Sequence, residues 1–264
     1  MRILLTNDDG IAAPGLEVLQ QIAGELSDDV WTVAPETNQS GASHSLTLHE
    51  PLRCRETAER TFAVKGTPTD CVIMGVRHLL ADKRPDLLLS GVNLGQNLAD
   101  DVTYSGTIAG AIEGTMLGIP SIALSLAVRM RGPQSIHWET PLKVGPDLVR
   151  RLLAAGWPAN VALNVNFPDR LPGDVAGLEI TSQGMRDQDL LSIVDRLDTR
   201  GTPYYWFGLS RQISSPPEGT DLWAVSAGHI SVTPLHLDLT HTRTCEDLRR
   251  ALAGPLPDGA GDRD

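Results

Sequence analysis

The chain has 264 residues, of which 41% are hydrophobic and 21% are charged, and its formal net charge is -11 at pH 7. This composition is typical of a folded globular protein, and the excess of acidic residues disfavours polymeric nucleic acid and anionic membranes as partners. Three widely spaced cysteines without a CxxC pair indicate neither a disulfide framework nor a cysteine-based zinc site. No apolar run approaches the roughly 20 residues that cross a bilayer, and the chain starts with a strand pattern rather than a leader, so we expect a cytoplasmic protein.

The first residues, MRILLTNDDG, place two adjacent carboxylates directly after a short apolar run. Residues 3–6 are predicted to form a buried strand, so Asp8 and Asp9 follow its carboxyl end, where open α/β sheets bind ligands. Two neighbouring carboxylates repel each other, and this loop contains no Lys or Arg to offset their charge. A hard divalent cation with oxygen ligands, Mg²⁺ or Mn²⁺, is the expected partner. A solvated turn is the alternative.

Helical and extended patterns alternate after this motif. Apolar residues at helical spacing follow Pro14, and an extended run covers residues 30–33, which completes a β-α-β unit. Residues 67–70 form a helix start, from which a helix is predicted to run to about residue 80. Further strands are predicted at 86–90, 121–126 and 161–165, and further helices at 107–117 and 141–155. Up to about residue 170 the alternation predicts a doubly wound, mostly parallel sheet in a Rossmann-like, three-layer α/β/α arrangement.

The pattern changes after residue 170. Gly and Pro separate further extended runs, without long helices between them, which predicts β-hairpins; the runs are 178–181, 204–209, 222–227 and 230–233. Residues 204–207 are consecutive aromatics, for which packing against a partner subunit and filling of the core are equally good explanations. We therefore predict an α/β core at 1–170, a β-rich extension with hairpins and a C-terminal helix at 171–254, and a disordered tail at 255–264.

The loop after the second strand, residues 35–44, is expected to open on the same sheet edge as the two carboxylates. Asn38 and Ser40 offer neutral oxygens as ligands or hydrogen-bond partners. His44 is the better-placed histidine for substrate binding or proton transfer, because its loop opens on that edge, and His236 is a weaker candidate. A loop of Ser, Asn and Gly is often a plain connection, so its composition alone does not establish a site.

A second polar segment, residues 90–107, starts at a strand end and finishes at a helix start. From this loop Asn93 and Asn97 are expected to face the metal ion. The helix start offers backbone N–H groups and hydroxyls to a phosphate, from Ser105, Gly106 and Thr107. Helix N-termini bind phosphate through free N–H groups and the positive end of the helix dipole. A helix-capping role for the hydroxyls is the structural alternative, and it does not exclude phosphate binding because an anion uses the same donors.

At these residues the chain closely resembles the SurE family of metal-dependent phosphatases that act on nucleoside monophosphates. The resemblance rests on segments in the expected order: ILLTNDDGIAAPG at 3–15, VAPETNQSGASHSLTL at 33–48, KGTPTDCV at 65–72, PDLLLSGVNLGQNLADDVTYSGTIAGAIEG at 85–114 and SVTPLHLDLT at 231–240. It implies that one divalent ion per subunit, Mg²⁺ or Mn²⁺, is held by Asp8, Asp9, Ser40 and Asn93. It also implies hydrolysis of nucleoside 5′- and 3′-monophosphates and of short polyphosphate. A homodimer or homotetramer with exchanged C-terminal elements is implied as well.

For such a site we expect metal-assisted attack of water on a phosphate monoester, with Asp8 and Asp9 as catalytic carboxylates. The phosphate is expected at residues 105–107, with Asn97 and His44 as further substrate contacts. One alternative is a phosphatase with an aspartyl nucleophile, which would favour a D-x-D arrangement after the first strand. Another is a non-catalytic nucleotide-binding α/β module, which would favour a Gly-rich first loop.

Overall fold

The computed structural model of the chain describes residues 1–128, 136–186, 191–209 and 215–253. This part is built on a nine-stranded sheet with the strand order β3-β4-β2-β1-β5-β6-β7-β11-β8. Neighbouring strands are parallel except for the pairs β3–β4 and β7–β11. The strands are β1 (Arg2–Thr6), β2 (Asp29–Pro35), β3 (Cys54–Ala58), β4 (Thr61–Val64), β5 (Leu87–Leu94), β6 (Ser121–Leu126), β7 (Val161–Phe167), β8 (Gly177–Ile180) and β11 (His229–His236). The predicted mostly parallel α/β sheet is confirmed.

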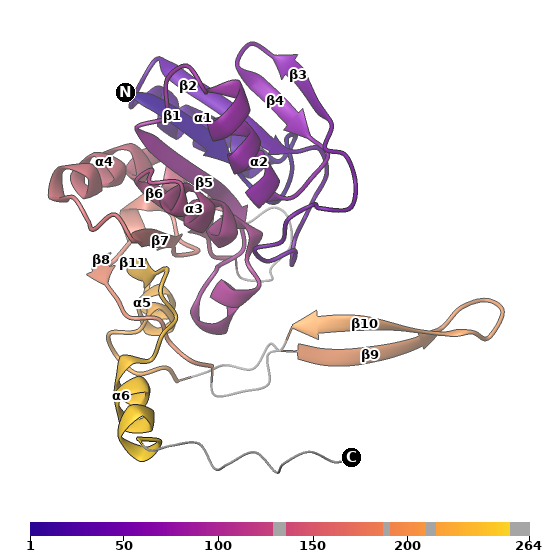
Figure 1. The fold of residues 1–264 in the computed structure, drawn as a ribbon, viewed down its shortest axis with the longest axis vertical. Coiled ribbons are helices and arrows are strands. Elements are labelled where there is room, and N and C mark those ends of the chain that lie inside the picture. The colour runs from indigo at the N-terminus through magenta and orange to yellow at the C-terminus, as the bar shows by residue number, and fades with distance from the viewer. Residues whose placement is uncertain (129–135, 187–190, 210–214, 254–264) are drawn as a thin grey trace, which may run out of the picture.

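Helices cover both faces of this sheet (Figure 1). They are α1 (Pro14–Gly24), α2 (Pro68–Met74), α3 (Gly106–Met116), α4 (Glu139–Ala155) and α5 (Asp221–Ala227), whereas α6 (Thr242–Ala251) has no buried residue and lies apart from the sheet. Successive residues of a strand point to opposite faces. In β6, Ile122 and Leu124 therefore pack in the core formed with α1 and α4, whereas Ala123 packs against α3. Leu4 of β1 faces α2 in the same way. The predicted three layers are confirmed.

The strand order reverses at β1. From β1 the chain first builds β2 on one side and later returns to place β5 on the other. Open α/β sheets bind ligands at such a reversal, because the connections after the two strands leave toward opposite faces. The carboxyl ends of β1 and β5 carry Asp8, Asp9 and Asn93. The topology therefore brings together residues that the chain separates by more than eighty positions.

Local capping signals account for the two helices nearest this edge. Thr67 accepts from Asp70 N, and the Asp70 carboxylate accepts from Thr67 N, so the predicted capping box starts α2 with Pro68 in its first turn. A single π-helical turn, η1 (Gly75–Leu79), continues α2 to the predicted end near residue 80. Ser105 caps α3, since its Oγ accepts from Ile108 N at 3.1 Å. Residues just before α3 form a 3-10 turn, η2 (Ala99–Thr103).

The C-terminal region differs from its predicted form. Residues 222–227, predicted as extended, belong to helix α5, so that prediction is wrong. Thr220 caps the helix by accepting from Trp223 N, and Gly228 ends it in the left-handed conformation with φ 94°. The runs at 178–181 and 230–233 do form strands, but β8 pairs in parallel with β11, and β11 joins β7 in the main sheet rather than forming a hairpin with β8. The predicted boundary near residue 170 falls between β7 and β8, two strands of one sheet.

A hairpin formed by β9 (Leu191–Leu197) and β10 (Pro203–Leu209) extends away from the body of the molecule (Figure 1). A further 3-10 turn, η4 (Pro172–Asp174), precedes β8. Helix α6 is the predicted C-terminal helix, and the predicted disordered tail at 255–264 lies outside the described residues. All three cysteines are free thiols. None of the described helices combines the length and the apolarity needed to span a bilayer.

Strand β3 forms one edge of the sheet, and the sequence patterns did not predict it. All of its residues are exposed. It pairs with β4 in an antiparallel ladder whose register shifts between Glu56 and Ala58. The Arg55 guanidinium lies 2.9 Å from Glu36 at the end of β2. The edge strand is therefore charged, irregular and open to solvent.

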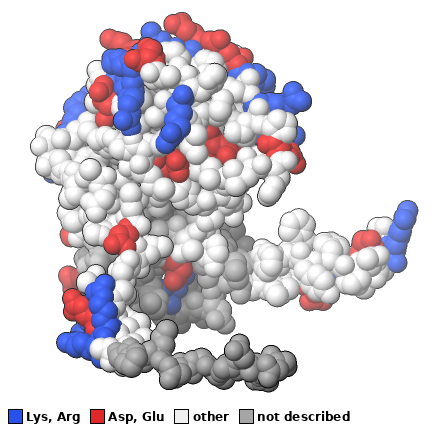
Figure 2. All heavy atoms as spheres, viewed as in Figure 1, with Lys and Arg blue, Asp and Glu red and all other residues white. Residues whose placement is uncertain are grey.

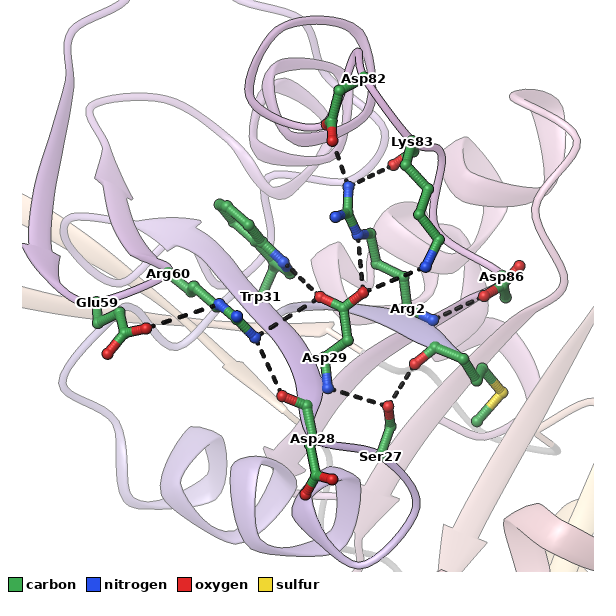
Figure 3. Close-up of polar contacts among 11 residues, drawn as sticks. Arg2, Ser27, Asp28, Asp29, Trp31, Glu59, Arg60, Asp82, Lys83 and Asp86 are labelled. Atoms are coloured by element: carbon green, nitrogen blue, oxygen red, sulfur yellow. Dashed lines mark hydrogen bonds and ion pairs between the residues drawn. The ribbon is translucent and has the colours of Figure 1, made fainter.

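A cluster of charged side chains lies at the amino ends of β1 and β2 (Figure 3). Asp8 lies at the other end of these strands, after the carboxyl end of β1. Arg2 Nε lies 3.1 Å from Asp29 Oδ2, and Trp31 Nε1 donates to Asp29 Oδ1 at 2.9 Å. The guanidinium groups of Arg2 and Arg60 lie 5.5 and 5.7 Å from the Trp31 ring centroid. Burial alone would raise the pKa of Asp29, but hydrogen bonds from Trp31 and Arg2 outweigh it and lower the pKa to about 2.

Candidate metal and phosphate site

The loop after β1 turns sharply and separates the two adjacent carboxylates. The Asn7 side chain donates to Gly10 O at 2.9 Å and accepts from Gly10 N at 3.3 Å. Gly10 has a φ of 105°, which glycine adopts at little cost. Asp8 is buried and Asp9 is half-buried. The turn therefore allows two successive residues to make contacts in different directions.

Asp8 contacts the first turn of α3. Thr107 Oγ1 donates to Asp8 Oδ1 at 2.5 Å, and the Thr107 N–H also donates to this carboxylate. A Cβ on Gly106 would lie 2.7 Å from Asp8 Cβ, so the close approach requires glycine. Burial raises the pKa of Asp8 to about 6; the Thr107 hydroxyl opposes this rise, and the charge of Asp9 adds to it. A desolvated carboxylate thus lies at the positive end of the α3 dipole.

Asp9 is held by the two loops that were expected to meet it. Its Oδ1 accepts from Asn38 Nδ2 at 3.4 Å, and its Oδ2 accepts from Leu94 N at 3.3 Å. Asn38 Oδ1 in turn accepts from Ser40 N at 2.8 Å. Burial raises the pKa of Asp9 as well. The loop that carries Ser40 and the strand end that carries Asn93 therefore both adjoin the carboxylate pair.

The donor set at this edge suits a hard divalent cation. Among the ion pairs of the described residues none includes Asp8 or Asp9, so no described Lys or Arg neutralises them. The described ranges also contain no group of three or more His, Cys, Asp or Glu that could hold a metal. A cation here would therefore add neutral oxygens to the two carboxylates. Carboxylate, hydroxyl, amide and water oxygens are the ligands that Mg²⁺ and Mn²⁺ prefer, and the residues present fit such an ion.

The side chains expected to bind phosphate are engaged inside the protein. Ser105 caps α3, and the Thr107 hydroxyl donates to Asp8. Asn97 is buried, and its Nδ2 donates to Ser125 Oγ at 2.8 Å and lies 3.5 Å from Thr107 Oγ1. Anion binding at the start of α3 therefore depends chiefly on the backbone and the helix dipole.

The two candidate histidines lie in different places. His44 Nε2 is 2.9 Å from Glu113 Oε2. Glu113 lies two helical turns after Gly106 on α3, or about 10 Å along the helix axis. His236 pairs with Val161 at the amino end of β7. It therefore lies at the amino ends of the parallel strands, whereas Asp8 lies at their carboxyl ends. His44 thus flanks the helix that starts at the site, whereas His236 lies away from it.

Several contacts that shape the site have no local signal in the sequence. Gln39 N donates to Asp8 O at 2.7 Å, and Ser43 Oγ donates to Thr103 O at 2.7 Å. The 35–44 loop is therefore fastened both to the end of β1 and to the segment before α3. Asn166 on β7 accepts from the backbone N–H of Asn97, a residue 69 positions earlier in the chain. Patterns of neighbouring residues cannot reveal such pairs.

The family model described as Survival protein SurE matches residues 3–189. The chain belongs to the SurE family. The SurE match includes Asp8, Asp9, Ser40 and Asn93, and it ends just before the β9–β10 hairpin. Membership confirms the resemblance drawn from the sequence motifs.

Relatives of this SurE chain match it over almost its full length. A protein of Parvibaculum lavamentivorans named 5′-nucleotidase SurE is 58% identical over 252 residues, which are 96% of this chain and 91% of the relative. A protein of the same name from Caulobacter vibrioides is 56% identical over 262 residues, covering 99% of this chain and all of the relative. The crystal structure of the SurE protein from Aquifex aeolicus matches with a TM-score of 0.82 at 42% identity, over 95% of this chain and 99% of the other. The α/β fold described above is therefore the SurE fold.

Proposed function

We propose that this SurE chain hydrolyses nucleoside 5′- and 3′-monophosphates to nucleoside and phosphate with a bound divalent cation, and that it also cleaves short polyphosphate. One observation carries the proposal: Asp8 and Asp9 are desolvated, lack a described cationic partner and stand beside the start of α3. An anionic substrate binds next to such a pair when a cation offsets their charge. The name 5′-nucleotidase, which the relatives carry, supports the substrate class.

The proposed ligands of one Mg²⁺ or Mn²⁺ ion per subunit are Asp8, Asp9, Ser40 and Asn93. Such an ion would supply positive charge to offset that of the phosphoryl oxygens and would make the attacking water more acidic. Thr107 orients the Asp8 carboxylate, while Asn38 and the Leu94 N–H orient that of Asp9. Asp9 is the more exposed of the pair, so we assign it the role of base that takes the proton of the attacking water.

The phosphate is proposed to bind at the first turn of α3, at Ser105, Gly106 and Thr107. Gly106 has no side chain of its own, although Asp8 packs against it, and the helix dipole favours an anion there. His44, held by Glu113 about two helical turns away, is proposed to contact the nucleoside part of the substrate. Asn97 is 7% exposed and hydrogen-bonded within the protein, which supports an indirect role for it through Thr107.

The β9–β10 hairpin supports a homodimer or homotetramer. Trp206 and Phe207 are 64% and 78% exposed, and Figure 2 shows an uncharged surface along much of the hairpin, with charged side chains gathered toward its tip. A two-stranded hairpin is marginally stable alone in water, and contiguous apolar surface of this kind marks an interface. We therefore propose that the hairpin packs against another copy of the chain, which favours partner packing over core filling for residues 204–207.

Phosphate release over a panel of 5′- and 3′-mononucleotides and polyphosphate, each with Mg²⁺, Mn²⁺ or EDTA, tests the proposed activity. Asp8→Asn and Asp9→Asn are expected to abolish turnover while the protein stays folded, because each change removes charge repulsion. Asp28→Asn is the matched control and should retain activity. Asp28 is exposed and lies just before the amino end of β2, far from the carboxyl ends of the strands where Asp8 lies.

The outcomes separate the alternatives. Full turnover by Asp8→Asn or Asp9→Asn in metal-supplemented buffer would contradict the metal-centred mechanism. A trapped covalent aspartyl phosphate would instead establish an aspartyl nucleophile. Nucleotide binding without metal and without turnover would establish a binding module.

A further inference from the structure

Strand β7 carries two asparagines in the interior of the sheet. Asn164 and Asn166 alternate with Leu163, Val165 and Phe167, and all of these side chains are buried. The apolar residues face the core with α1 and α4, so the two asparagines face the side of the sheet covered by α3. Burying a carboxamide costs free energy unless its donors and acceptors are satisfied. Two of them on one buried strand therefore call for a specific set of partners.

Both asparagines converge on the peptide groups of Asn97. Asn164 Nδ2 and Asn166 Nδ2 donate to Asn97 O at 2.8 and 3.1 Å. Asn166 Oδ1 accepts from Asn97 N at 2.8 Å, and the two carboxamides join each other at 3.2 Å. Asn97 is thereby fixed at both its N–H and its carbonyl, although it lies in the loop between β5 and η2.

The chain of hydrogen bonds continues from Asn97 to the carboxylate. Asn97 Nδ2 donates to Ser125 Oγ at 2.8 Å and, more weakly, to Thr107 Oγ1 at 3.5 Å. A Thr107 hydroxyl that accepts from Asn97 directs its own proton to Asp8 Oδ1, at 2.5 Å. Ser125 is the cross-strand neighbour of Asn166, so from β6 it holds the side chain of the residue whose backbone Asn166 holds from β7. A continuous buried path therefore runs from β7 to Asp8.

We propose that Asn164, Asn166 and Ser125 are positioning residues that set the affinity of the site for its cation by fixing Asn97 and, through Thr107, the orientation of the Asp8 carboxylate. This inference rests on the metal site assigned under the proposed function. Groups that hydrogen-bond directly to a metal ligand commonly change metal affinity 10- to 100-fold when removed, and residues that act through Asn97 and Thr107 should have an effect at or below the low end of that range. All three side chains are fully buried, and none is among the assigned metal ligands or substrate contacts.

Ser125→Ala is the decisive variant, with Ser121→Ala as its matched control. Both serines lie on β6, point to the same face and are fully buried, and each makes a hydrogen bond through its Oγ. Ser121 donates to Ile119 O at the amino end of β6, away from Asp8. Mn²⁺ binding to the full-length protein is measured by isothermal titration calorimetry, and thermal unfolding is recorded for each variant without metal.

We expect Ser125→Ala to raise the Kd for Mn²⁺ roughly three- to tenfold and Ser121→Ala to leave it unchanged, with similar losses of thermal stability in the two variants. With saturating Mn²⁺, kcat of Ser125→Ala should return close to the wild-type value. Asn166→Ala should weaken Mn²⁺ binding further; if it fails to fold, Ser125→Ala decides the question alone.

An unchanged Kd for Mn²⁺ in Ser125→Ala, with a loss of stability equal to that of Ser121→Ala, would overturn the inference and leave these residues a purely structural role. The wild type separates this result from failure of the proposed function. If it binds Mn²⁺, responds to Ser125→Ala as expected and yet releases no phosphate from mononucleotides, the activity is refuted and the inference stands. If the wild type binds no Mn²⁺, the inference falls together with the metal site.

Discussion

Gly106 is the first residue of α3, and it lies against Asp8 with no room for a side chain. In Gly106→Ala the new methyl group would stand 2.7 Å from Asp8 Cβ and 3.1 Å from Asp8 Oδ2. Neither contact involves the far end of a long, flexible side chain, because Asp8 is short and is held by Thr107. The substitution should therefore displace the carboxylate or the start of the helix.

The size of the displacement sets the expected effect. To reach an ordinary contact of 3.4 Å from 2.7 Å, the two groups must separate by about 0.7 Å. Misplacements near 1 Å cost about 100-fold in rate, so we expect kcat/KM for a mononucleotide to fall roughly 10- to 100-fold. Overpacking costs about 1–3 kcal/mol, and the better helix propensity of alanine offsets up to about 1 kcal/mol, so the free energy of unfolding should fall by about 3 kcal/mol at most.

Phosphate release at limiting and saturating Mn²⁺, together with urea unfolding, measures both effects. Gly24→Ala is the control, because Gly24 ends α1 and a Cβ there would meet no atom within 4 Å. It should leave kcat/KM unchanged and, if anything, stabilise the protein slightly. Wild-type kcat/KM in Gly106→Ala would refute the argument that the contact between Gly106 and Asp8 positions the site.

Three further predictions concern other parts of the molecule. Thr107→Val removes the hydroxyl that donates to Asp8, and it should lower kcat/KM at least tenfold, as expected for the loss of a hydrogen bond to a charged group. Thr107→Ser keeps a hydroxyl and should restore kcat/KM. Equal kcat/KM in the Val and Ser variants would contradict this prediction. The pKa of Asp29 lies near 2, below its usual value, so its interactions stabilise the protein above pH 4 and are lost as the pH falls toward 2. Because the Asp29 side chain is 29% exposed, Asp29→Asn should cost about 1 kcal/mol at pH 7 in urea unfolding, and a deficit that persists unchanged at pH 2 would refute the assignment. Phe207→Glu should shift the proposed oligomer toward monomer in light scattering, and an unaltered mass would remove the hairpin from the proposed interface.

Local signals explain why much of the site could be predicted from sequence. A short apolar strand, two acids and a glycine define the loop at Asp8 and Asp9, and a hydroxyl before each helix marks the starts of α2 and α3. Each signal acts over a few residues, so neighbouring positions are enough to recognise it. The topology of parallel strands then places the strand ends at one edge.

Other features depend on residues that are distant in the chain. The run at 222–227 is short and apolar, and periodicity cannot distinguish a strand from a helix over such a length; the caps at Thr220 and Gly228 decide for a helix. The path from Asn166 to Asn97 joins strands and loops that only folding brings together. The engagement of Thr107 with Asp8 likewise depends on how closely α3 approaches β1.

The charged edge strand β3 also bears on how copies of the chain meet. An exposed sheet edge offers unpaired backbone groups to any strand that approaches it, and charges and irregular registers are common defences against such pairing. Arg55 and Glu56, with the register shift after Glu56, place both defences on β3. These features therefore disfavour edge-to-edge pairing of main sheets from different copies, which would build filaments. If association is directed to the β9–β10 hairpin instead, the assembly can close at a small, fixed number of copies and stay soluble at high concentration.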